Sequence, residues 1–230
     1  MSSAEPTVAE PVSSSAVEAL AFRAPYVIER LVKDRIADSV SEAEQLFSEV
    51  KKYLVLTDVS RDAVLGMYSA RVDEAWHAFI LYTAEYANFC MRFFGRHIGH
   101  VPKNAPRDDT NDQEHCAELT FDAFETRYQA FFKEPLPYVW YDVRNVTAAR
   151  RVFNDLPSSA TVVQHNPVAE LLDETGDVIL SANDLAHDAL AFIARTGAFY
   201  VRELPGALTE DEKVALVKAL MSVGVLRIAP

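Results

Sequence analysis

Cysteine and glycine are scarce in this chain. Two cysteines, Cys90 and Cys116, occur among 230 residues, too few for the disulfide framework of a small secreted domain. A reducing cytosol is therefore the expected setting. The seven glycines leave little for phosphate-binding loops, and no P-loop, G-x-G-x-x-G or G-x-S-x-G motif is present. Nucleotide binding through these loops and hydrolysis at a nucleophile elbow are not indicated.

Basic residues are also few. The chain has 22 Lys and Arg against 34 Asp and Glu, a net charge of -12. This balance argues against binding to nucleic acid through a basic surface and against docking on anionic membranes. No apolar run approaches the length of a membrane span. Residues 1–16 contain no Lys or Arg and no apolar core, so they are expected to be a disordered acidic tail, not a secretory signal.

Helical periodicity dominates residues 17–156, the expected first domain. Residues 17–36 have an imperfect helical pattern that Pro25 interrupts. Ser41 with Glu44 fits a capping box that would start the next helix, whose Lys51 and Lys52 fall off the apolar stripe and should face water. One long helix or two shorter ones should follow before Gly95. A last helix is expected over residues 115–132.

The pattern changes after Pro157, Ser158 and Ser159, a plausible boundary before a second domain over residues 160–230. A short strand over 177–180, a helix to Ile193, an extended piece over 199–204, a helix started by a Thr209–Glu212 capping box and a strand over 225–228 form the outline of a winged helix. We therefore predict a mostly α protein: an all-helical domain followed by a small winged-helix-like α+β domain.

Polar groups gather in the apolar stretch from Arg71 to Pro102. Asp73 and His77 are four residues apart, which places them on one face of a helix. His100 could reach them from beyond the break at Gly95. Two histidines and one carboxylate with open positions are a set used by non-haem iron, and similar sets bind zinc or copper. Asp73 could equally orient His77 without touching the metal.

Other side chains of the same region could extend this site. Cys90 is a softer ligand that would favour zinc or copper, and His97, Tyr86 and His115 are further candidates. A structural interpretation stays open beside the metal site: the histidines could be core residues bonded to Asp73 or to the backbone, and Cys90 a small buried hydrophobe.

Several of these residues carry a family resemblance. Asp73-x-x-Trp76-His77, Tyr86, Cys90, Gly95 and a terminal His-x-Pro resemble the glycine-rich domain-containing protein-like family of bacteria and plants, over about residues 40–145. The run from Phe131 to Trp140 resembles a second element of that family. Two departures occur, because Phe79 stands where many members have a second histidine, and the glycine-rich tail is missing. The resemblance implies a helical domain more than a reaction.

The C-terminal seventy residues resemble winged-helix peptide-binding domains of the PqqD-like kind, which hold leader peptides for modifying enzymes. The acidic balance of this part disfavours DNA as the ligand of a winged helix. Two functions follow as expectations. The first is a metal-dependent enzyme that modifies a ribosomally made peptide, a step in natural product biosynthesis, with the second domain holding the substrate. The second is a non-catalytic binding or scaffold protein with structural histidines.

Overall fold

The computed structural model describes residues 14–100, 118–157 and 159–229. The chain divides into two compact units, Met1–Trp140 and Tyr141–Pro230. This boundary lies ahead of the one expected at residues 157–159, because strand β1 (Arg151–Asn154) pairs with strands near the C-terminus. The first helix begins at Ser14, inside the stretch expected to be a tail, and residues 1–13 of that tail lie outside the described residues.

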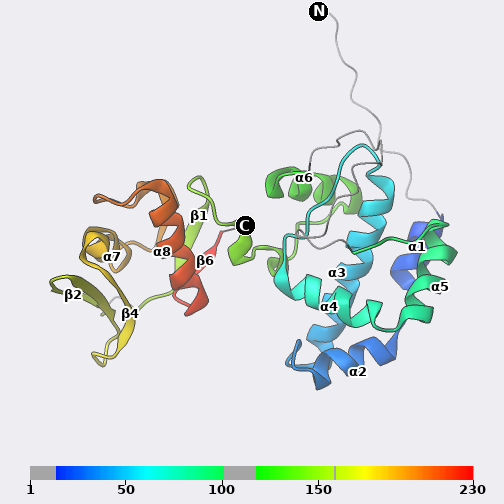
Figure 1. Ribbon diagram of the computed structural model, residues 1–230, viewed down its shortest axis with the longest axis horizontal. Helices are drawn as coiled ribbons and strands as arrows, with labels where there is room; N and C mark the ends of the chain where they lie inside the picture. Colours follow the sequence, from blue (N-terminus) through cyan, green and yellow to red (C-terminus); the bar gives the residue numbers. More distant parts are fainter. Residues whose placement is uncertain (1–13, 101–117, 158, 230) are drawn as a thin grey trace, which may run out of the picture. The chain divides into compact units, whose positions relative to one another are not determined.

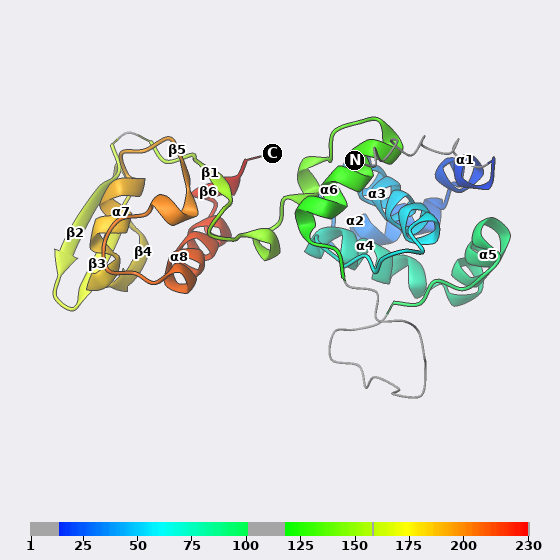
Figure 2. The same ribbon diagram turned by 90° about the horizontal axis from the view of Figure 1, so that it is seen from above.

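The N-terminal unit is helical, and α3 is its central element. Helices α1, α2 and α4 pack against α3, and Figures 1 and 2 show α3 running through the middle of this unit. The helices of the unit are α1 (Ser14–Ala21), α2 (Pro25–Lys33), α3 (Val40–Val59), α4 (Ala70–Ile80), α5 (Thr83–Phe94) and α6 (Phe121–Phe132), followed by a 3-10 turn, η1 (Tyr138–Trp140).

Local sequence signals explain most helix ends. Pro25 occupies the first turn of α2, where its missing N–H costs nothing. The N-cap of α3 is Ser39, whose side chain accepts a hydrogen bond from the Glu42 backbone N–H. The Glu42 carboxylate in turn accepts a hydrogen bond from the Asp38 backbone N–H. The expected cap at Ser41 is therefore wrong by two residues. Gly95 ends α5 with a φ of 67°, the left-handed conformation that glycine adopts without strain.

Aromatic side chains fill the core where α1, α3, α4 and α5 meet. The Phe79 ring lies edge-on to those of Phe47 and Phe89, with ring centroids 5.2 Å and 5.4 Å apart. The centroids of Phe22 and Phe89 are 5.0 Å apart. Such rings are large contributors of buried apolar area. The concentration of aromatics in the sequence is thus explained mainly by packing.

The expectation that Lys51 and Lys52 face water is wrong. Lys51 is 8% exposed, and its ammonium donates to the carbonyl oxygens of Leu20 and Phe22 at the end of α1. Burial lowers the pKa of Lys51. A helix end offers carbonyl groups that lack partners inside the helix, so a buried cation is satisfied there.

Lys52 belongs to a buried polar network between α3 and α6. It donates to Glu49 at 3.0 Å and to the Tyr128 hydroxyl at 3.0 Å, and it forms an ion pair with Glu134. Glu49, 5% exposed, accepts from Tyr128 at 2.9 Å and from the Trp140 indole at 2.8 Å. Burial alone would lower the pKa of Lys52, but the hydrogen bonds to the two carboxylates outweigh it, and the pKa is raised.

The C-terminal unit contains two antiparallel three-stranded sheets, in the orders β5-β1-β6 and β2-β3-β4. Helix α7 packs on β2 and β3, and Val162 pairs with the buried Leu171 on the sheet. Besides β1, the elements are β2 (Thr161–His165), β3 (Val168–Leu172), β4 (Val178–Asn183), α7 (His187–Ile193), β5 (Ala198–Tyr200), α8 (Glu210–Ser222) and β6 (Leu226–Ile228), with short 3-10 turns at Val143–Asn145, Asp184–Ala186 and Val201–Glu203.

The sequence predicted part of this unit. The order α7, β5, α8, β6 agrees with the expected helix, extended piece, helix and strand, and Thr209 with Glu212 forms the expected capping box. Strands β1, β2 and β3 were not expected. The described part of the chain is therefore mostly helical with two small sheets. Within the described ranges, no helix is both long and apolar enough to cross a membrane.

Candidate metal centre

Helix α4 carries two of the three residues of the candidate centre. Its N-cap is Ser69, whose hydroxyl accepts from the Val72 amide and donates to the Val139 carbonyl at 2.7 Å. This anchors the first turn, where Asp73 lies. His77 is one turn further along the same face, which the (i, i+4) spacing predicted. The buried face of α4, including Trp76 and Phe79, fixes the rotation of the helix.

His100 arrives from the segment after α5. Gly95 reverses the chain, Arg96 pairs with Asp58 of α3 at 3.1 Å, and Ile98 is 3% exposed in the core. The Tyr86 hydroxyl donates to the Ile98 carbonyl at 2.6 Å. The segment is therefore fixed on both sides before it reaches His100.

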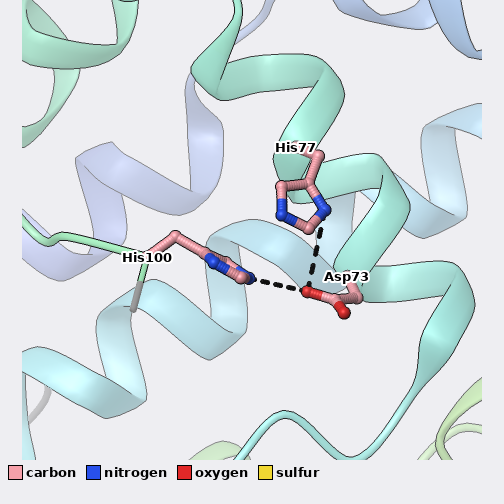
Figure 3. Close-up of side chains that lie close together, drawn as sticks. All are labelled: Asp73, His77 and His100. Carbon is pink, nitrogen blue, oxygen red and sulfur yellow. Dashed lines mark hydrogen bonds and ion pairs between the residues drawn. The ribbon is translucent and has the colours of Figure 1, made fainter. Parts of the chain in front are cut away.

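The three side chains converge, as Figure 3 shows. His100 Nε2 lies 2.8 Å from Asp73 Oδ1, and His77 Nδ1 lies 3.8 Å from the same oxygen. The two imidazole centroids are 4.2 Å apart. One ligand atom from each residue lies within 4.8 Å of the other two. In a tetrahedral site with metal–ligand distances of about 2 Å, the ligand atoms are about 3.3 Å from one another. Small rotations of the three side chains would therefore bring their ligand atoms to the distances that an ion requires.

Exposure differs across the centre. The His77 side chain is 53% exposed, whereas the side chains of Asp73 and His100 are each 18% exposed. Trp76 closes the inner side, since its ring packs edge-on against His100 with centroids 4.6 Å apart. The arrangement thus has an apolar wall on one side and solvent on the other, which would leave room for water or a substrate beside three protein ligands.

The same three side chains can also interact with one another directly, without a metal ion. The Asp73 carboxylate and the His100 ring form a hydrogen bond that gives each of these half-buried polar groups a protein partner. Imidazoles and carboxylates are the ligands of zinc and of iron in two-histidine, one-carboxylate sites. The described side chains are therefore able either to bind an ion or to hold the segment around His100 against α4.

The other candidates lie in different surroundings. Cys90 is fully buried on α5, and burial raises the pKa of its thiol, which disfavours the thiolate that a metal needs. Burial likewise raises the pKa of Tyr86. His97 is exposed, with its ring 5.4 Å from that of Tyr86. His115 lies outside the described residues. Among the described residues, the cluster capable of holding an ion consists of Asp73, His77 and His100.

Sequence reasoning missed the role of Tyr86. The sequence suggested the Tyr86 hydroxyl as an additional metal ligand. In the structure this hydroxyl accepts a hydrogen bond from the Trp76 indole N–H at 3.1 Å and donates one to the Ile98 carbonyl. A tyrosine ten residues after a tryptophan carries no pattern that would reveal this bond. The contact depends on how α4 and α5 pack.

Comparison with known proteins adds one finding. The model of a family described as UCP032817-like matches residues 14–123, slightly less than half of the chain. The match includes α1 to α5 and all three residues of the candidate centre. The chain matches no curated protein. It also matches no solved structure.

Proposed function

We propose that this chain is a metal-dependent enzyme that modifies a ribosomally made peptide. The observation that supports it is the convergence of Asp73, His77 and His100, with His77 and His100 side by side and His77 open to solvent. Structural histidines would more often be sealed among protein partners. A cytoplasmic setting, favoured by the few cysteines, and a relation to the glycine-rich domain-containing protein-like family are parts of the same proposal.

The ligand set narrows the choice of metal to iron, zinc or copper. Two imidazoles and one carboxylate suit non-haem iron(II) and catalytic zinc, and imidazole also suits copper. His77 and His100 would bind through ring nitrogens, and Asp73 would supply the negative charge. When bound, the ion would act as a Lewis acid or activate a water molecule. Trp76 would exclude water from the inner side of the site.

The proposal assigns peptide binding to the C-terminal unit, as a winged-helix-like recognition domain. Strand β4 is an edge of the β2-β3-β4 sheet. A groove of about 440 Å³ lies between β4 and α8. Its apolar lining consists of Leu180, Ala182, Leu185, Ala186, Leu208, Leu216 and Ala219. An extended peptide could add a strand to β4 and place alternate apolar side chains in this groove.

Removing both imidazoles tests the metal site. Protein purified without a His tag is expected to contain iron, zinc or copper close to one ion per chain, and a His77→Ala, His100→Ala double variant is expected to lose it while staying folded. Two neutral nitrogen ligands are lost, which leaves one carboxylate of the set. Metal content is measured by mass spectrometry, and folding by circular dichroism.

The matched control is a His165→Ala, His187→Ala double variant. These two histidines belong to the C-terminal unit and are not among the three residues of the candidate centre, so the metal content should stay at the wild-type level. Absence of metal from the wild type, even after reconstitution with each ion, would contradict the enzyme proposal. The Asp73–His100 hydrogen bond would then favour the second candidate, a non-catalytic binding or scaffold protein.

A pair of arginine substitutions on α8 tests the peptide groove. Extended peptides selected from a displayed library on the full chain are expected to lose at least about 10-fold in affinity when Ala219→Arg fills the groove, since an unpaired charge replaces apolar contact. Ala215→Arg makes the same change at an exposed position outside the groove and should leave the affinity unchanged. Equal binding to both variants would place the peptide elsewhere.

A further inference from the structure

Two buried hydrogen bonds connect helix α4 to the segment that carries His100. The Trp76 indole N–H donates to Tyr86 Oη at 3.1 Å, and the Tyr86 hydroxyl donates to the Ile98 carbonyl at 2.6 Å. Tyr86 is 1% exposed, Ile98 3% and Trp76 4%. Buried polar groups that lose such partners are costly, so this relay is a rigid link.

The relay joins the elements that hold the three candidate ligands. Trp76 lies directly before His77 on α4, and Ile98 lies two residues before His100. Trp76 also contacts the His100 ring itself, with centroids 4.6 Å apart. Two residues span at most about 7 Å of extended chain, so the Ile98 carbonyl restricts where the His100 backbone can be.

We infer that Tyr86 is a positioning residue of the candidate metal centre: its hydroxyl fixes His100 at hydrogen-bonding distance from Asp73 by holding the Ile98 carbonyl. This inference rests on the proposed metal site and adds to it a residue that touches no metal. Supporting groups of this kind usually change metal affinity by about 10- to 100-fold.

Tyr86→Phe tests the inference, with Tyr128→Phe as the matched control. Tyr128 is also buried in the N-terminal unit, and its hydroxyl donates to the Glu49 carboxylate at 2.9 Å, in the network between α3 and α6. Each variant keeps its ring and loses one hydroxyl. Zn²⁺ affinity is measured by competition titration, the visible spectrum with bound Co²⁺ reports ligand geometry, and denaturant unfolding reports the stability of each variant.

We expect Tyr86→Phe to weaken Zn²⁺ binding by at least about 10-fold and to shift the Co²⁺ spectrum. Tyr128→Phe should leave both at wild-type values even where it lowers the unfolding midpoint. Unchanged Zn²⁺ affinity in Tyr86→Phe, or equal losses in the two variants, would overturn the positioning role while leaving the metal site intact.

A readout without metal separates the two proposals. If the wild type binds no ion, the proposed function fails, and the position of His100 is followed by the NMR signals of its imidazole ring. These signals are expected to move in Tyr86→Phe and to stay in Tyr128→Phe, since the Asp73–His100 hydrogen bond depends on the held segment. Ring signals that stay unchanged in Tyr86→Phe would overturn the inference.

Discussion

Replacing Asp73 with asparagine is expected to lower the metal affinity of this chain by more than the roughly 10- to 100-fold that loss of an outer-sphere partner costs. Asparagine keeps the size of the side chain and an oxygen that can face the His100 ring, but it removes the negative charge of the candidate ligand set. Asp73 Oδ1 is 2.8 Å from His100 Nε2 and 3.8 Å from His77 Nδ1, so it is placed to share an ion with both rings. Isothermal titration with Zn²⁺ measures the change.

Glu74→Gln is the control for this substitution. Glu74 is the next residue of α4, is exposed, and lies outside the candidate ligand cluster, so its variant removes the same unit of charge without touching the site. Its Zn²⁺ affinity should stay near that of the wild type. A loss within about 10- to 100-fold for Asp73→Asn would instead make Asp73 a partner that orients the imidazoles, and no loss would remove Asp73 from the site.

Replacing Glu49 with alanine is expected to lower the free energy of unfolding of the N-terminal unit by about 3–5 kcal/mol, the usual cost of removing one member of a buried ion pair. Glu49 is the acceptor for the Tyr128 hydroxyl and the Trp140 indole, and it pairs with Lys52 at 3.0 Å. The substitution removes this acceptor and leaves the half-buried Lys52 with Glu134 as its remaining carboxylate partner. Unfolding in urea, followed by tryptophan fluorescence, reports this unit because both tryptophans lie in it.

Two further variants serve as controls for Glu49→Ala. Glu44→Ala removes an exposed carboxylate from the same helix and should change the stability by less than about 0.5 kcal/mol. Glu49→Gln keeps an acceptor but removes the charge, so its loss should be smaller than that of the alanine variant. A Glu49→Ala protein as stable as the Glu44→Ala protein would show that the buried network contributes nothing to the stability of the fold.

The sequence predicted the helices of the N-terminal unit because their signals are local. Periodicity marks α3 and α4, Pro25 interrupts the pattern over residues 17–36 where α2 begins after α1, and Gly95 breaks the pattern at the end of α5. The pairing of Asp73 with His77 on one face follows from the same geometry. Strands β2 and β3 were missed because their burial depends on α7 and on each other, which no single segment encodes.

The burial of Lys51 was also not predicted from the sequence. A lysine off the apolar stripe is normally solvated, and its satisfaction by the Leu20 and Phe22 carbonyls requires that the end of α1 lie beside α3. The same applies to Glu49, whose partners Tyr128 and Trp140 come from 79 and 91 residues further along the chain. Contacts of this range are set by helix packing, not by spacing.

The sequence by itself determined which residues could bind a metal: a carboxylate and an imidazole one helical turn apart, with a second imidazole beyond a glycine. Only the tertiary structure decided that His100, 27 residues after Asp73, lies 2.8 Å from that carboxylate. It also decided that Cys90 is buried, that the Tyr86 hydroxyl donates a hydrogen bond to the Ile98 carbonyl, and that the Trp76 ring packs against His100. The physical reason is that chain reversal at Gly95 and the packing of α4 on α5 place groups together that no local pattern relates.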